Sequence, residues 1–137
     1  MPRVSKAIAA IVRERAKHAC EYCLRPDASS QWRFVCDHVI AVQHLGPTAP
    51  ENLAFCCPFC NAHKGPNVAG VDPATGAVIP LFNPRRDNWR EHFRWSGATL
   101  VGVSAAGRAT VVALAMNDPT QLIVRTTLIA DGKMSTA

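Results

Sequence analysis

Residues 51–65 read ENLAFCCPFCNAHKG, and they give the clearest indication of the fold in this chain. Its apolar run Leu53–Cys56 predicts a short strand. Pro58 then stands at the first turn of a predicted short helix, which Gly65 ends. Upstream, residues 32–40 read WRFVCDHVI and predict another strand, because aromatic and β-branched residues favour strands. The middle of the chain therefore predicts the order strand, loop, strand, helix.

Four cysteines form two C-x-x-C pairs, Cys20-Glu-Tyr-Cys23 and Cys57-Pro-Phe-Cys60. Two intervening residues let both sulfurs of a pair reach one tetrahedral ion, so the pairs predict a closed structural zinc site. The 33 residues between the pairs exceed the usual spacing of about 15–20, which implies an inserted hairpin. Cys56 is a rival to Cys57, although the matched spacing favours Cys57. Cys36 and Cys56 are then expected to be buried thiols.

A dithiol redox protein is the alternative to zinc, but it needs one C-x-x-C on a βαβ frame, which the sequence does not show. Six cysteines would also suit disulfides in a secreted protein. The early apolar run 7–12 is too short for a signal peptide, and no run approaches the roughly 20 apolar residues of a membrane helix. We therefore expect a cytoplasmic protein without a membrane segment, whose cysteines bind metal.

The composition is that of a globular chain rather than a disordered one, with 48% hydrophobic and 18% charged residues among 137. This length fits one domain, 1–137, of mixed α+β class. A helix is expected at 5–17, with Ser5 as its cap. Further along, the sequence predicts strands at 77–82 and 98–103, and helices after Asp87, at 108–116 and from Pro119 to about Ile129.

The ordered combination of CEYC, CDHVI, a loop with glycine and prolines, and ENLAFCCPFCNAHKG resembles the HNH endonuclease family. The resemblance covers about 17–66, and the run GVDPATGAVIPLFNPRRDNWREHFRW is similar to a small bacterial HNH subgroup. It implies a ββα-metal core clasped by zinc, with a C-terminal α/β extension at about 70–137. The implied activity is metal-dependent hydrolysis of DNA, most simply double-stranded DNA.

The resemblance also implies roles for four residues. His38 matches the general base, and Asn52 matches the asparagine whose amide ties the loop and orients the base. Asn61 and Asp37 match the protein ligands of a catalytic ion, and their hard oxygens suit Mg²⁺ or a similar divalent cation. Strand alternation would send Asp37 and His38 to opposite faces, so only the resemblance brings both to one site. Taken singly, each of these residues could instead be a cap, turn or packing residue.

A formal net charge of +5 favours a polyanionic partner such as nucleic acid, although a protein can be basic without binding one. Lys64 is expected near phosphate because it shares a helix face with Asn61. Arg85 and Arg86 are expected to contact the nucleic-acid backbone, since aromatic residues accompany them. The aromatics could equally be core residues. A non-catalytic zinc-binding nucleic-acid module is the rival to the enzyme, and the sequence leaves the oligomeric state open.

Overall fold

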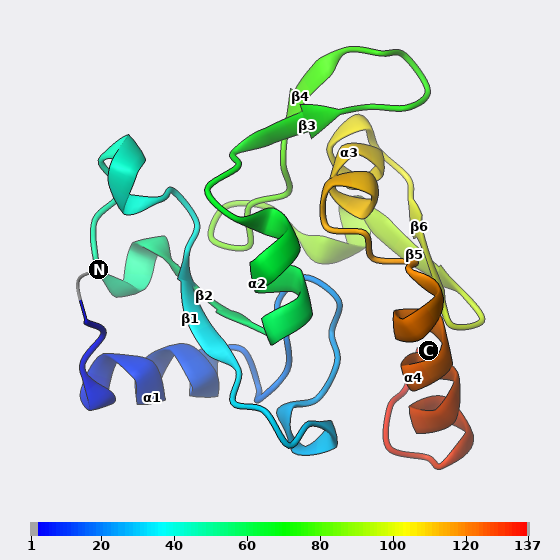
Figure 1. Ribbon diagram of the computed structural model, residues 1–137, viewed down its shortest axis with the longest axis horizontal. Coiled ribbons are helices and arrows are strands. Elements are labelled where there is room, and N and C mark those ends of the chain that lie inside the picture. The colour runs from blue at the N-terminus through cyan, green and yellow to red at the C-terminus, as the bar shows by residue number, and fades with distance from the viewer. Residues whose placement is uncertain (1–2, 137) are drawn as a thin grey trace.

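The computed structural model describes residues 3–136, and its elements are arranged as in Figure 1. The helices are α1 (Lys6–Arg15), α2 (Pro58–Lys64), α3 (Ala105–Ala113) and α4 (Pro119–Ala130). The strands form three antiparallel pairs: β1 (Val35–His38) with β2 (Leu53–Cys56), β3 (Ala69–Val71) with β4 (Val78–Pro80), and β5 (Phe93–Ser96) with β6 (Thr99–Gly102). The predicted α+β class is confirmed.

Helix α1 begins where the sequence predicts, because the Ser5 hydroxyl accepts a hydrogen bond from the Ile8 amide at 3.2 Å. Its buried face is narrow. Val12 is fully enclosed and packs in one cluster with Leu53 and Phe55 of β2, whereas Ile11 is 53% exposed. The helix therefore rests on the β1–β2 hairpin through Val12, with Ile8 and Ala16 packed against the same cluster.

The central unit has the predicted order of strand, loop, strand and helix, and in Figure 1 α2 lies beside the β1–β2 hairpin. Strand β1 is shorter than the predicted 32–40, and Trp32 stands 69% exposed ahead of it. The two strands pair with Asp37 opposite Ala54 and His38 opposite Leu53. This register places the Asp37–His38 pair at the end of the ladder, next to the loop that joins the strands.

The C-terminal part differs from its sequence prediction in three places. The segment after Asp87 forms only a one-turn 3-10 helix, Trp89–Glu91, and then strand β5. The third helix begins at 105 instead of 108, because the Ser104 hydroxyl accepts from the Gly107 amide at 2.9 Å and caps it. Strand β3, which the sequence does not signal, exists because it pairs with β4.

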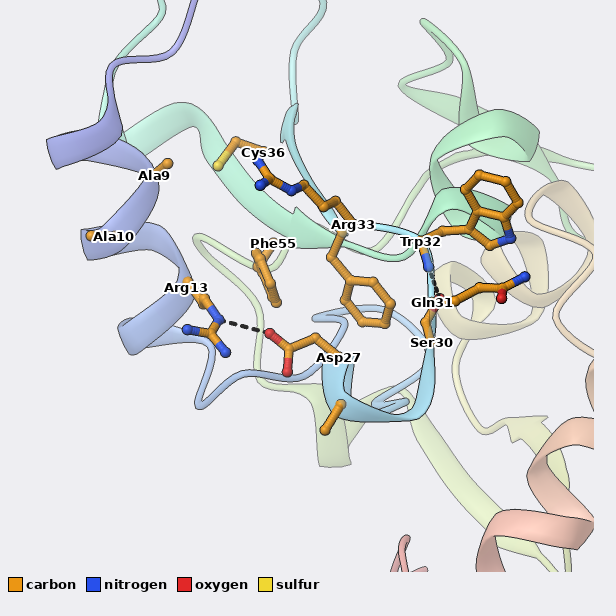
Figure 2. A pocket seen from close by; sticks show the side chains of 12 residues that line it. Ala9, Ala10, Arg13, Asp27, Ser30, Gln31, Trp32, Arg33, Cys36 and Phe55 are labelled. Carbon is orange, nitrogen blue, oxygen red and sulfur yellow. Dashed lines mark hydrogen bonds and ion pairs between the residues drawn. The ribbon is translucent and has the colours of Figure 1, made fainter.

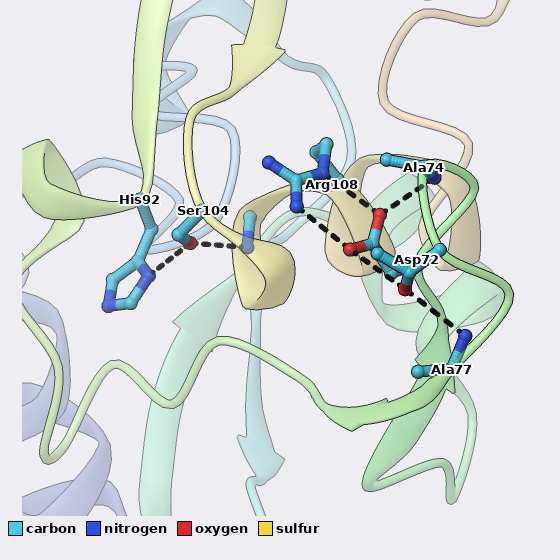
Figure 3. Close-up of polar contacts among 8 residues, drawn as sticks. Asp72, Ala74, Ala77, His92, Ser104 and Arg108 are labelled. Atoms are coloured by element: carbon cyan, nitrogen blue, oxygen red, sulfur yellow. Dashed lines mark hydrogen bonds and ion pairs between the residues drawn. The ribbon is translucent and has the colours of Figure 1, made fainter.

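Buried polar contacts hold the C-terminal elements together (Figure 3). Asp72, which is fully buried, accepts from Arg108 Nε at 2.9 Å and from Nη2 at 2.8 Å. This bidentate pair lowers the pKa of Asp72 to about 2. Nearby, His92 Nδ1 lies 2.6 Å from the Ser104 hydroxyl. These contacts fasten β3 and β5 to helix α3, so they serve the scaffold.

One buried cluster spans both halves of the chain, from Cys20 and Tyr22 to Phe82, Phe93 and Leu114. Phe82 and Phe93 pack edge to face with centroids 5.2 Å apart. The indole of Trp89 donates to the Tyr22 carbonyl at 2.8 Å. The C-terminal segment thus braces the first cysteine pair. Among the described residues, no helix is long and apolar enough to cross a membrane.

Candidate active site and metal centre

The four predicted cysteines come together as one buried cluster. The sulfurs of Cys20, Cys23, Cys57 and Cys60 all lie within 4.8 Å of one another. The Cys23 and Cys57 sulfurs are 3.8 Å apart. Zinc–sulfur bonds of about 2.3 Å in a tetrahedron require sulfur–sulfur distances of about 3.8 Å. The geometry of the donor set therefore fits a Zn²⁺ ion.

Both cysteine turns have the same local construction. The Cys23 amide donates to the Cys20 sulfur at 3.5 Å, and the Cys60 amide donates to the Cys57 sulfur at 3.3 Å. These donors favour the thiolate forms that a metal requires. In the second turn the Cys57 sulfur also serves as the cap of α2, so one side chain begins the helix and joins the cluster.

Of the two remaining cysteines, only Cys56 is as buried as the sequence predicts. Cys56 is fully buried beside the cluster, and all six cysteines are free of disulfides. Cys36 is only half-buried and faces the hollow between α1 and the β1–β2 hairpin (Figure 2). Arg13 and Asp27 form an ion pair of 2.7 Å, and they line this hollow together with Phe34 and Phe55. Within residues 3–136, the cysteine cluster is the one group of three or more metal-ligating side chains of Cys, His, Asp and Glu type.

Asp37, His38 and Asn61 line a single cavity of about 610 Å³. Asp37 and His38 come from the end of β1, Asn61 is the fourth residue of α2, and residues 41–43 of the loop also line the cavity. The strict alternation that would separate Asp37 from His38 does not apply, because His38 is the last residue of the strand and the chain turns away after it. A carboxylate, an imidazole and an amide, which are side chains suited to metal-dependent hydrolysis, thus line one cavity.

Asn52 ties the loop that frames this cavity. Its side-chain oxygen accepts from the Ile40 amide at 3.0 Å, and its side-chain nitrogen donates to the carbonyls of Ile40 at 3.0 Å and Pro47 at 2.9 Å. Gly46 permits this arrangement, because a Cβ there would overlap the Ile40 carbonyl oxygen and lie 2.8 Å from Asn52 Nδ2. The loop contact expected of Asn52 is therefore present.

The imidazole of His38 is held by Thr48 from the same loop. The distance from His38 Nε2 to the Thr48 hydroxyl is 2.9 Å, and the residue is 8% exposed. Sequence reasoning missed Thr48, because a threonine between prolines carries no local signal for such a contact. Since Nε2 is engaged, Nδ1 is the ring nitrogen that remains for other chemistry.

Residues 20–67 match the sequence profile of the HNH endonuclease family. We call this matched segment the HNH domain, after the family that it resembles. Searches of curated proteins and of solved structures gave no match to the chain. The matched segment contains all four zinc-fitting cysteines and all residues of the shared cavity. The resemblance seen in the sequence is thus confirmed for this part of the chain.

Lys64 of the HNH domain does not lie where the sequence predicts. It is 2% exposed, and its ammonium lies 3.0 Å from Asp37 Oδ2 and 3.2 Å from the His38 carbonyl oxygen. Burial raises the pKa of Asp37, and the Lys64 ammonium opposes that rise. The prediction that Lys64 is free to contact phosphate is therefore corrected. The helix face was inferred properly, but the side chain turns inward to the nearest carboxylate.

Arg85 also has a different place from the one expected. Its guanidinium forms an ion pair with Glu21, and both side chains are nearly buried. The other oxygen of Glu21 accepts from the Phe55 amide at 2.8 Å. Arg85 therefore links the C-terminal part to the HNH domain and is not free for a nucleic-acid backbone. Its charge finds a partner 64 positions away, which no local pattern reveals.

Arg86, in contrast, is exposed and lines a second cavity of about 360 Å³ with His44 and Asn67. Lys64 lies in the wall of this cavity and contacts Asp37 of the first, so the two hollows are neighbours. The aromatics near Arg86 pack among themselves, with the rings of Trp89 and Phe93 centred 5.2 Å apart. The aromatics of this segment thus pack together, whereas Arg86 stays exposed.

Proposed function

We propose that this protein is a metal-dependent endonuclease that hydrolyses phosphodiester bonds of DNA. The observation that carries the proposal is the shared cavity of Asp37, His38 and Asn61 within an HNH domain. The adjoining cysteine cluster would hold a structural Zn²⁺, which staples the two ends of the domain. A chain of this size gains stability from such a staple, and cysteine thiolates persist in the reducing cytoplasm.

His38 would act as the general base through Nδ1. If Nε2 carries its proton and donates it to the Thr48 hydroxyl, Nδ1 has a free lone pair directed away from that contact. An imidazole can accept a proton from water near neutral pH, and the resulting hydroxide attacks phosphorus in line. The P–O3′ bond breaks, the leaving O3′ takes a proton from solvent water, and His38 returns the proton it accepted to solvent, so the products carry a 5′ phosphate and a 3′ hydroxyl.

Asp37 and Asn61 would hold the catalytic divalent cation, with Mg²⁺ as the expected ion. Their donor set fits: a carboxylate and an amide oxygen are hard ligands, and both residues line the cavity. When bound, the ion polarises the phosphate and stabilises charge on the leaving oxygen. Asn52 keeps the loop and His38 in register through its three hydrogen bonds to loop backbone.

Double-stranded DNA is the proposed partner. The net charge of +5 supports binding to a polyanion, and Arg86 offers an exposed guanidinium in the neighbouring cavity. Because phosphate contacts add to affinity whatever the sequence, Arg86 would strengthen binding without choosing a target.

Cleavage of supercoiled plasmid tests the proposal. The protein is expected to nick or linearise plasmid with Mg²⁺ or Mn²⁺ and to stop when EDTA is added. His38→Ala and Asn61→Ala should each slow cleavage by about 10²–10⁴-fold, the typical contribution of acid–base catalysis. His63→Ala is the matched control on α2, because His63 is exposed and stacks on Phe59 outside the cavity.

Each outcome separates the proposal from its rivals. A zinc-binding module without catalysis would retard DNA in a gel and leave the plasmid intact. A dithiol protein would do neither, and its zinc would be lost on oxidation. Undiminished cleavage by His38→Ala would remove the catalytic assignment.

A further inference from the structure

Lys64 is an unusual residue to find beside a cation site, because it places a positive charge against the carboxylate that would bind the metal. Its ammonium has three N–H donors. Three oxygens surround it: Asp37 Oδ2 at 3.0 Å, the His38 carbonyl at 3.2 Å and the Gly65 carbonyl at 3.5 Å. With the side chain 2% exposed, solvent cannot replace these contacts.

The two oxygens of Asp37 have different surroundings. Oδ2 is buried, and within the described chain Lys64 is its one ionic partner. Oδ1 is not buried, and it accepts no hydrogen bond from the described part of the chain. Asp37 also lines the cavity. Lys64 thus holds one oxygen and leaves the other for a cation.

The same ammonium touches both the strand end that carries Asp37 and His38 and the turn that follows α2. It contacts the carboxylate of Asp37, the backbone of His38 and the turn after α2, the helix that carries Asn61. Lys64 is therefore placed to keep these segments in position before any ion binds. The positive charge of Lys64 also neutralises the carboxylate of Asp37. An incoming divalent cation therefore meets a carboxylate whose negative charge is already compensated.

We propose that Lys64 is a positioning residue that keeps the binding of the catalytic divalent cation weak until nucleic acid binds. The inference rests on the proposed function. Asp37 alone, already paired with Lys64, would bind a divalent cation weakly. A phosphate of bound nucleic acid supplies the anionic oxygens that Lys64 does not neutralise, so each ligand raises the affinity for the other by the same factor. The ion would then be held firmly only when substrate is present.

Mn²⁺ binding followed by the EPR signal of the free ion tests this inference without measuring turnover. Zinc-loaded proteins carry His38→Ala so that a short DNA duplex stays intact, and Mn²⁺ bound by duplex alone is subtracted. We expect the duplex to tighten Mn²⁺ binding about tenfold or more. Lys64→Met should tighten Mn²⁺ binding in the absence of DNA by about tenfold to a hundredfold, as loss of a nearby like charge predicts. The duplex should still tighten Mn²⁺ binding by this variant, because the phosphate oxygens that act as ligands remain.

Two variants serve as controls. Lys64→Arg keeps the charge and should behave as the parent protein, whereas Lys6→Met removes an exposed lysine of α1 and should change neither affinity. Zinc content and thermal melting report whether each variant folds. Equal or weaker Mn²⁺ binding by folded Lys64→Met would overturn the inference. If that variant does not fold, the parent protein still decides, since Mn²⁺ binding unaffected by duplex contradicts cooperativity. Plasmid cleavage tests the proposed function separately.

Discussion

Replacement of Gly46 by alanine probes the loop that frames the active site. Gly46 approaches the 40–41 turn so closely that an added Cβ would overlap the Ile40 carbonyl oxygen and lie 2.8 Å from Asn52 Nδ2. Both obstacles are positions that cannot give way cheaply, since one is backbone and the other is a buried amide with three hydrogen bonds. The loop itself must therefore move.

The expected loss of stability follows from those bonds. Displacement of the loop breaks up to three hydrogen bonds of Asn52, each with a net contribution of about 1 kcal/mol, so Gly46→Ala should lower the free energy of unfolding by about 3 kcal/mol. Gly132→Ala is the matched control. Gly132 has a φ of +71° and open space around its Cβ position. It should lose only the conformational preference of glycine, about 1 kcal/mol.

Urea denaturation of the zinc-loaded variants measures both values, and zinc content should stay at one ion per chain because the cysteine cluster lies outside the loop. The loop carries Thr48, which holds His38, so Gly46→Ala should also reduce plasmid cleavage by an order of magnitude or more at temperatures where it is folded. A Gly46→Ala protein within about 0.5 kcal/mol of the parent, and no less stable than Gly132→Ala, would refute the steric argument.

Three further outcomes are expected. Because Arg108 holds the pKa of Asp72 at about 2, below its ordinary 3.8, the pair stabilises the fold above pH 3.8 and loses that effect as the pH falls through about 2. Asp72→Asn should therefore have a lower melting temperature than the parent protein at neutral pH, and the two melting temperatures should converge in acid. Arg85→Ala should lower the melting temperature, whereas Arg86→Ala should leave it unchanged and weaken duplex binding severalfold in a fluorescence titration. Cys23→Ser should lose zinc together with folding, measured by metal analysis and circular dichroism, and a folded, metal-free protein would contradict this.

Local spacing predicted much of the site, because the relevant residues are close in the sequence. The C-x-x-C turns and the helix that begins at Pro58 depend on neighbours within four positions. For the same reason, β2 has the predicted bounds. The predictions fail for short strands that form only because a neighbouring strand pairs with them. Strand β3 depends on β4, and the segment near Phe93 joins a sheet whose partner strand follows a glycine turn.

The placement of charges could not be predicted in the same way. Lys64 and Arg85 both look like free cations in the sequence, and both are nearly buried against carboxylates. A basic residue is expected to be solvated unless a partner is known, and the partners lie 27 and 64 positions away. Arg86, adjacent to Arg85, is exposed and lines the cavity beside the active site.

Metal-ligand spacing and side-chain type are properties of the chain, so the sequence alone predicts the cysteine cluster and identifies the candidate catalytic residues. Only the tertiary structure decided that Asp37, His38 and Asn61 share one cavity and that Lys64 neutralises Asp37 from behind. The physical reason is that strand pairing ends at His38 and helix α2 folds back beside it, which brings distant donors together. Such proximity depends on packing between elements, and packing has no signature in any single stretch of sequence.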